Sequence, residues 1–240
     1  MKTLTKSVFT VGLLVMLMAV PAFGASINKS IKVEAGGESS GATSVNGSIT
    51  VGEHAVVSGN VKTVNGSVRV DAGARIQNAS TVNGGIRIES GVETENLSTV
   101  NGSIKVGETA TVDGEIKAVN GRITVAKGSS VADDVSNVNG RIHLAGAEVG
   151  GGVSTVSGDV SIVEGSVVKG SVIVEKPSNW GFGKSKTRKP RIVIGPGSTV
   201  EGVIELERKV ELFISETANV GGVEGVMSID DAVRFSGNKP

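Results

Sequence analysis

The sequence predicts an all-β fold, a single-stranded parallel β-helix (β-solenoid) of about ten triangular coils, each 18–19 residues long. The first observation behind this prediction is a repeated word, Val-Asn-Gly, which begins at Val45, Val64, Val82, Val100, Val119 and Val138 and returns as Val156-Ser157-Gly158. The copies are 19, 18, 18, 19, 19 and 18 residues apart, and a unit this short buries its apolar side chains only by stacking on its neighbours. Aromatic residues make up only 2% of the chain, too few for an ordinary layered core.

Residues 1–24 have the pattern of a secretory signal peptide. Lys2 and Lys6 precede a largely apolar run from Val8 to Val20, and small residues then predict a mature start at Ala25. The run is shorter than the roughly 20 residues that span a bilayer, although an uncleaved anchor stays open as the alternative. We therefore expect secretion across the inner membrane, to the periplasm or the cell surface. The chain has no cysteine, so stability depends on stacking rather than on disulfides.

From 25 to 226 the chain is expected to form one solenoid domain, because apolar residues recur every six positions. Two inward positions per six residues, alternating with polar ones, indicate a short strand and a corner, so three strands complete a coil. The first face carries Ile31/Val33, Ile49/Val51, Val68/Val70, Ile86/Ile88, Ile104/Val106, Ile123/Val125, Ile142/Leu144, Val160/Ile162, Ile192/Ile194 and Leu212/Ile214. The second carries Val57, Ile76, Thr94, Val112, Val131, Val149, Val168, Val200 and Val220. The third carries Val61, Ala79, Leu97, Ile116, Val135, Val153, Val172 and Ile204.

The Asn-Gly pair marks the corner that precedes the first face. We expect its glycine to supply a positive φ and its asparagine side chains to bond up and down the stack as an amide ladder. The same dipeptide is also the strongest short signal for a two-residue hairpin, so a meander of hairpins stays open as the alternative. At the two ends, the coil at 27–44 is polar and degenerate, and the tail at 227–240 drops the pattern and is expected to act as a cap.

One insertion, residues 176–191, interrupts the repeat where an Asn-Gly word is expected. It holds six basic residues, no acidic residue and the only tryptophan; without it and the leader, 16 basic and 24 acidic residues remain. Such a loop suits an anionic envelope polymer or a membrane surface. The alternative is a solvated loop whose tryptophan packs on the side of the solenoid. The expected partner contacts are Trp180, Lys184, Lys186, Arg188 and Lys189.

A second candidate is a basic stripe of outward residues on the first face. Its strongest members are Arg69, Arg87 and Lys105, on consecutive coils about 4.8 Å apart. They could line a linear anionic polymer, or they could only keep a β surface soluble. Nucleic acid is disfavoured as a partner by the export pattern and by the lack of aromatic stacking positions.

Catalytic and cofactor motifs are absent from the sequence pattern. Gly183-Lys184-Ser185 resembles the end of a phosphate loop, but Ser178 stands where that motif needs glycine. His54 and His143 fall on different coils, and no carboxylate pair is recognised on one face. We therefore expect no enzyme activity, no cofactor, no metal and no small-molecule substrate.

The words Thr-Val-Asn-Gly-Gly-Ile-Arg-Ile at 81–88 and Thr-Val-Asn-Gly-Ser-Ile-Lys-Val at 99–106 resemble exported adhesin-like repeat proteins of bacteria. The run Ile-Gly-Pro-Gly-Ser-Thr-Val-Glu-Gly-Val-Ile at 194–204 resembles bactofilins, which form polymers in the bacterial cytoskeleton. The bactofilin resemblance implies triangular, right-handed coils that join end to end without nucleotide. The leader and the insertion are departures from that family.

The sequence thus leads to an exported, non-enzymatic structural or interaction solenoid of the bacterial cell envelope, with scaffold or adhesin-like character. The alternative is a self-assembling polymer like a bactofilin, in which the chain's partner is itself, end to end or side by side. A carbohydrate-active enzyme is the third and least favoured reading.

Overall fold

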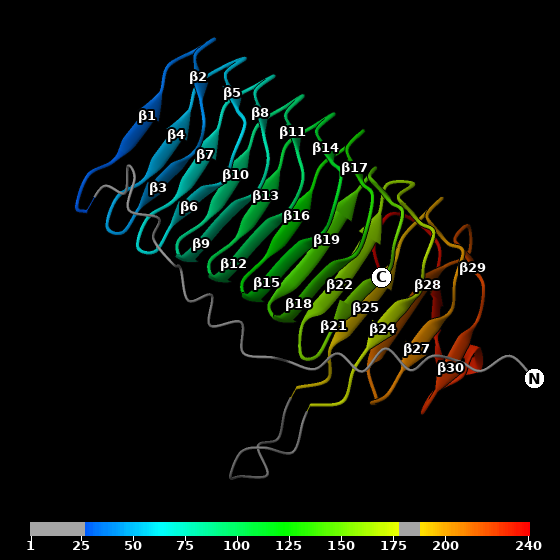
Figure 1. Ribbon diagram of the computed structural model, residues 1–240. Helices are drawn as coiled ribbons and strands as arrows, with labels where there is room; N and C mark the ends of the chain where they lie inside the picture. The colour runs from blue at the N-terminus through cyan, green and yellow to red at the C-terminus, as the bar shows by residue number, and fades with distance from the viewer. Residues whose placement is uncertain (1–26, 178–187) are drawn as a thin grey trace, which may run out of the picture.

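The protein is a rod of stacked coils in the computed structural model, which describes residues 27–177 and 188–240 (Figure 1). Each coil gives one strand to each of three parallel sheets, and these sheets hold 11, 10 and 10 strands. The predicted all-β parallel β-solenoid of about ten coils is therefore confirmed. The leader at 1–24, with Ala25, and residues 178–187 of the insertion lie outside the described part of the chain.

The first sheet contains β1 (Ile31–Val33), β4 (Ile49–Val51), β7 (Val68–Val70), β10 (Ile86–Ile88), β13 (Ile104–Val106), β16 (Ile123–Val125), β19 (Arg141–Ala145), β22 (Asp159–Val163), β25 (Arg191–Ile194), β28 (Glu211–Ser215) and β31 (Val233–Phe235). The second contains β2 (Glu38–Ser39), β5 (Val56–Val57), β8 (Arg75–Ile76), β11 (Glu93–Thr94), β14 (Thr111–Val112), β17 (Ser130–Val131), β20 (Glu148–Val149), β23 (Val167–Val168), β26 (Thr199–Val200) and β29 (Asn219–Val220). The third contains β3 (Ala42–Ser44), β6 (Val61–Thr63), β9 (Ala79–Asn83), β12 (Leu97–Asn101), β15 (Ile116–Asn120), β18 (Val135–Asn139), β21 (Val153–Thr155), β24 (Val172–Val174), β27 (Ile204–Leu206) and β30 (Val223–Gly225).

The register of the strands matches the columns predicted from the sequence. Ile104 pairs with Ile123 in the first sheet, Val112 with Val131 in the second and Ile116 with Val135 in the third, all in parallel ladders. Parallel pairing one coil apart excludes the hairpin meander, which would need antiparallel neighbours. The inward residues of the three sheets form one continuous buried cluster that fills the rod from Val33 to Ile214.

The corner glycines differ from the expectation in their physical role. Among the glycines of the Asn-Gly pairs, only Gly140 has a positive φ, at 129°, whereas Gly47, Gly66, Gly84, Gly102 and Gly121 do not. Instead, a Cβ at Gly102 would collide with the carbonyl oxygen of Gly84 in the previous coil, and the same clash repeats along this column. Glycine is needed here because stacked backbones approach each other too closely for any side chain.

The predicted amide ladder is present. The Asn101 side chain donates to Asn83 at 3.0 Å and accepts from Asn120 at 3.1 Å, and the same bond links each coil to the next from Asn28 to Asn139. A second, shorter ladder joins Asn60, Asn78 and Asn96 at 2.8 Å per bond at the corner before the third sheet. This second ladder was not predicted from the sequence.

The C-terminal segment closes one end of the rod. The short 3-10 helix η1 (Ile229–Asp231) leads into β31, which pairs in parallel with β28 and adds the eleventh strand of the first sheet. Ile229 and Ala232 pack against the last core residues, and Phe235 is buried. Because η1 is the only helix in the described chain, none there is long and apolar enough to cross a membrane.

Candidate interaction site at the base of the insertion

The insertion leaves the rod after β24 and returns to it at β25 (Figure 1). Of the five residues predicted to contact a partner there, Trp180, Lys184 and Lys186 lie outside the described residues. Arg188 and Lys189 are described, and both are exposed. The structure therefore shows the base of the insertion.

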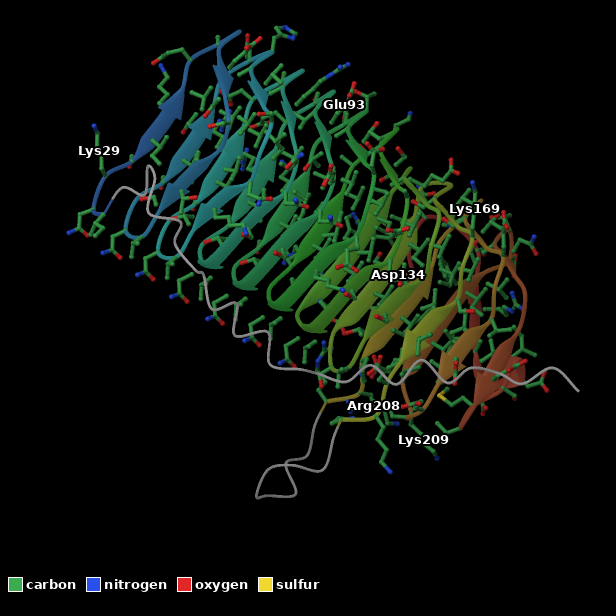
Figure 2. The ribbon with its side chains drawn as sticks, viewed as in Figure 1. Lys29, Glu93, Asp134, Lys169, Arg208 and Lys209 are labelled. Atoms are coloured by element: carbon green, nitrogen blue, oxygen red, sulfur yellow. The ribbon has the colours of Figure 1, made fainter. Side chains whose placement is uncertain are left out.

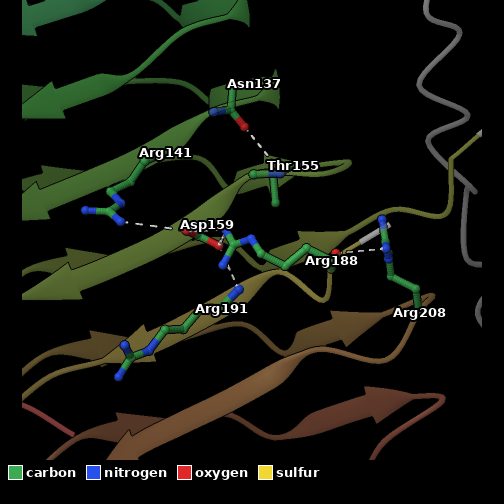
Figure 3. Close-up of polar contacts among 8 residues, drawn as sticks. Asn137, Arg141, Thr155, Asp159, Arg188, Arg191 and Arg208 are labelled. Carbon is green, nitrogen blue, oxygen red and sulfur yellow. Dashed lines mark hydrogen bonds and ion pairs between the residues drawn. The ribbon is translucent and has the colours of Figure 1, made fainter. Parts of the chain in front are cut away.

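Asp159 holds the returning end of the insertion. The Nη2 atom of Arg188 donates to both carboxylate oxygens of Asp159 at 2.6 and 2.7 Å, and the backbone N–H of Arg191 donates to it at 2.9 Å (Figure 3). Arg141, on the neighbouring strand, lies 3.8 Å from the same carboxylate. Arg188 thus has an intramolecular partner, which makes it an anchor of the insertion.

The charges around Asp159 favour its ionised form. Burial on its own would raise the pKa of Asp159. The hydrogen bonds from Arg188 and from the Arg191 backbone, with the charges of Arg188 and Arg141, outweigh burial and hold this pKa below its ordinary value. The carboxylate is therefore charged at neutral pH and keeps its contacts.

Glu207 holds the departing end of the insertion. It accepts a hydrogen bond from the backbone N–H of Lys176 at 2.9 Å. The adjacent Arg208 donates to the carbonyl oxygens of Val156 at 3.1 Å and of Arg188 at 3.5 Å, so it bridges the corner to the returning end. Both ends of the insertion are thereby fixed to the body of the rod.

Cations remain available around this base. Arg208 and Lys209 lie beside the two segments that lead into the insertion (Figure 2). Within residues 27–177 and 188–240, no ion pair joins a carboxylate to Lys189, Arg208 or Lys209. The described base therefore adds Arg208 and Lys209 to the positive charge that the sequence places in the insertion.

Two neighbouring carboxylates also lie at the base of the insertion, and they were not predicted from the sequence. Glu175 and Glu207 directly follow the in-register partners Val174 and Leu206. Partial burial raises the pKa of Glu175, and the charge of Glu207 raises it further. The expectation that no two carboxylates share one face was wrong here, because the insertion separates the two residues by far more than one coil period.

The basic stripe on the first sheet is in register as predicted, but its arginines are neutralised by neighbours. Arg69 pairs with Arg87, and Arg87 with Lys105, across successive strands. Arg69 contacts Asp71 at 2.7 Å and Glu89 at 2.9 Å, and Arg87 lies 3.7 Å from Glu89. Lys105 has no recorded ion pair among the described residues. The stripe is thus a mixed-charge surface rather than a strongly positive one.

The valines of the repeated word form a surface column of their own. They point outward from the end of the third sheet and are half-buried by stacking on each other, with Val119 the most exposed at 36%. The column comprises Val45, Val64, Val82, Val100, Val119, Val138 and Val156. An apolar strip of this length, next to the asparagine ladder, is typical of an interaction surface.

No match supplies a family. No protein-family model, curated protein or solved structure matches the chain. Within the described ranges there is also no group of three or more metal-ligating side chains. The candidate site therefore rests on its own geometry, an anchored base whose cations Lys189, Arg208 and Lys209 have no carboxylate partner among the described residues.

Sequence reasoning could not find Asp159 or the C-terminal segment that lies near it. Asp159 occupies the corner position that holds serine or glycine in the first coils, at Ser48, Ser67, Gly85 and Ser103, and arginine in the two coils before it, at Arg122 and Arg141. That substitution, in the coil just before the insertion, was the available signal. The packing of residues 238–240 against the same face depends on tertiary contacts that no repeat pattern encodes.

Proposed function

We propose that the chain is an exported, non-enzymatic β-solenoid that acts as a scaffold or interaction module of the bacterial cell envelope. The leader pattern at 1–24 supports export. The observation that carries the interaction role is the anchored base of the insertion, where Asp159 and Glu207 fix both ends of a basic loop to the rod. A fixed base limits the entropy that the loop loses on binding, which favours a defined contact.

The proposed partner is an anionic polymer of the envelope. Lys189, Arg208 and Lys209 would supply charge from the described base, and Lys184 and Lys186 from the loop. Trp180 would add an amphipathic ring of the kind enriched at interfaces. Because such contacts are largely electrostatic, affinity should fall as salt rises through the physiological range.

Co-sedimentation of residues 25–240 with purified peptidoglycan sacculi tests this proposal. Replacing Lys184, Lys186, Lys189 and Lys209 with alanine should abolish salt-sensitive binding while the circular dichroism spectrum stays unchanged. The matched control replaces four cations elsewhere on the rod, Lys29, Lys62, Lys117 and Lys127. Equal binding by both variants would remove the site, and binding only to anionic vesicles would replace the polymer by a membrane.

Self-assembly is the second candidate, and the two ends of the rod favour one form of it. Among the described residues, no strand pairs with the outer edges of β1, β2 and β3, whereas η1 and β31 cover the other end. Ile31 and Val33 bond to the next coil through backbone groups, so the N–H and C=O of Lys32 face the open edge. Open strand edges recruit other strands.

One open end predicts a dimer rather than a filament. Light scattering after size exclusion should then give twice the chain mass, and Lys32→Pro should return the monomer, because proline removes the edge donor and is tolerated on edge strands. Long filaments in electron micrographs would instead favour bactofilin-like growth from both ends. A wild-type monomer at all concentrations would exclude this candidate.

A further inference from the structure

A cavity lies on the outer face of the first sheet, where the C-terminal residues cross it. Its volume is about 730 Å³, a size that accommodates a small organic ligand. Arg141 and His143 come from β19, Asp159 and Ser161 from β22, and Arg191 from β25. Residues 238–240 form the opposite wall.

The charge balance of the cavity leaves positive groups available. Asp159 is already neutralised by Arg188, which does not line the cavity. Arg141, Arg191 and Lys239 then face two further anionic groups, the side-chain carboxylate of Glu164 and the main-chain carboxyl group of Pro240, so one positive charge stays unmatched. An anionic group on a ligand would therefore be attracted to the sheet side of the cavity.

The guanidinium group of Arg191 has two adjacent donors, Nε and Nη2, which we call its fork, and only one of them is hydrogen-bonded. Its Nη2 atom donates to the main-chain carboxyl oxygen of Pro240 at 3.3 Å, while its Nε atom is buried and has no hydrogen-bond partner. The guanidinium carbon lies 4.6 Å from the ring centre of Phe213, which fixes the plane of the fork. Adjacent Nε and Nη donors match the two oxygens of a carboxylate, and a buried donor without a partner is rare in folded proteins.

Glu164 adds an independent sign of function at the rim. It is one of four described non-glycine residues with a positive φ, at 56°. That conformation costs an ordinary residue roughly 1–2 kcal/mol, and the preceding coil has a glycine at the equivalent position, Gly146, with a φ of 61°. Strain of this kind persists mainly where a side chain is needed in place.

We propose that this cavity binds a small ligand that carries a carboxylate and a hydrogen-bond donor. The ligand's carboxylate lies on the Nε–Nη2 edge of Arg191, where it takes the place of the main-chain carboxyl group of Pro240. The donor, a hydroxyl or an ammonium group, lies on Glu164. This inference departs from the sequence-based expectation of no small-molecule ligand, and it does not depend on the proposed binding of an envelope polymer.

Two matched pairs of probes test the carboxylate and its source. N-acetylmuramic acid differs from N-acetylglucosamine by a lactyl carboxylate, and D-alanyl-D-alanine differs from its C-terminal amide by the charge. Isothermal titration calorimetry should show saturable 1:1 binding of at least one acid and binding about 10-fold or more weaker for its neutral analogue. The acid that binds more tightly identifies a sugar acid or a peptide as the source.

Two variants then locate the site. Arg191→Lys keeps the charge but removes the fork, and it should weaken acid binding about 10-fold or more. Glu164→Gly should bind more weakly and yet unfold at a higher temperature, because it loses the contact and the strain together. A merely structural role for Glu164 would not separate these two readouts. Arg75→Lys, on the second sheet and outside the cavity, is the control and should bind like the wild type.

Several results would overturn the proposal. One is the absence of saturable binding by either acid up to the solubility limit. Another is equal binding of acids and neutral analogues. A third is unchanged acid binding by a folded Arg191→Lys protein. Loss of sacculus binding by the insertion variants would leave the cavity titration unchanged, so the two proposals fail separately.

Discussion

Arg188 and Asp159 form a bifurcated ion pair that joins the end of the insertion to the coil before it. One nitrogen of the guanidinium donates to both carboxylate oxygens at 2.6 and 2.7 Å. The Arg188 side chain is 68% exposed and that of Asp159 only 14%, so the carboxylate is the fixed partner. The strand register of the rod therefore resumes at Arg191 after the Arg188–Asp159 ion pair, a contact that the repeated sequence pattern does not encode.

Replacing Asp159 with asparagine should loosen this junction. The variant loses the charge-assisted contacts of Arg188 and weakens the bond from the Arg191 backbone, at a cost of about 1–2 kcal/mol in the free energy of unfolding. The effect depends on pH, because the folded pKa of Asp159 is lowered. The ionised Asp159 carboxylate stabilises the folded protein fully when the pH is above the ordinary pKa of the unfolded chain. This stabilisation is lost as the pH falls through the lowered pKa of the folded state. Urea unfolding should therefore show a larger difference between the variant and the wild type at pH 7 than at pH 3.

Asp113→Asn provides the control for that experiment, since Asp113 is exposed on a regular corner. Its unfolding free energy should stay within about 0.5 kcal/mol of the wild type. Limited proteolysis should also cut Asp159→Asn faster than Asp113→Asn inside residues 176–191. Equal stability and equal cleavage of the two variants would show that the ion pair does not anchor the insertion.

Two glycine substitutions should distinguish the cost of a clash between stacked coils from the cost of a positive φ. Gly102→Ala places a Cβ against the carbonyl oxygen of Gly84 and must push two coils apart, which should cost about 3 kcal/mol or more. Gly91→Ala meets no atom within 4 Å, but its φ of 66° costs about 1–2 kcal/mol. Thermal unfolding of both variants shows which substitution lowers the stability more. A larger loss at Gly91 would contradict the close-approach explanation.

The repeat allowed the sheets, their register and the asparagine ladder to be predicted, because every coil repeats the same local rules. Ile104 and Ile123 could be paired from spacing alone. A positive φ was predicted for every Asn-Gly glycine and is found only at Gly140; at the others the reason for glycine is a clash between coils, as of Gly102 with Gly84, which a local property such as φ does not reveal. The contacts of Asp159 and the cavity near Arg191 lay beyond prediction, because they join segments that the period does not relate.

The asparagine ladder should contribute stability in proportion to the number of bonds each residue makes. Asn101 bonds to coils on both sides, whereas Asn139 has a recorded bond only to Asn120. Asn101→Ala should therefore lower the unfolding free energy by about 1 kcal/mol, and Asn139→Ala by about half of that. Chemical denaturation measures both. Equal losses would show that the number of ladder bonds does not determine how much each asparagine contributes to stability.

The Glu175–Glu207 pair should destabilise the wild type at neutral pH. Burial and the charge of Glu207 raise the folded pKa of Glu175 above its ordinary value of 4.5, so stability falls as the pH rises through this range. Glu175→Gln removes the charge, and its unfolding free energy should exceed that of the wild type by about 0.5–1 kcal/mol at pH 7, a modest gain because solvent screens a half-exposed group. The gain should vanish near pH 4, where Glu175 is protonated in both states. Glu53→Gln, at an exposed corner, should show no such pH-dependent gain in the same urea titrations. A gain that persists at pH 4 would trace the effect to packing rather than to repulsion between the two carboxylates.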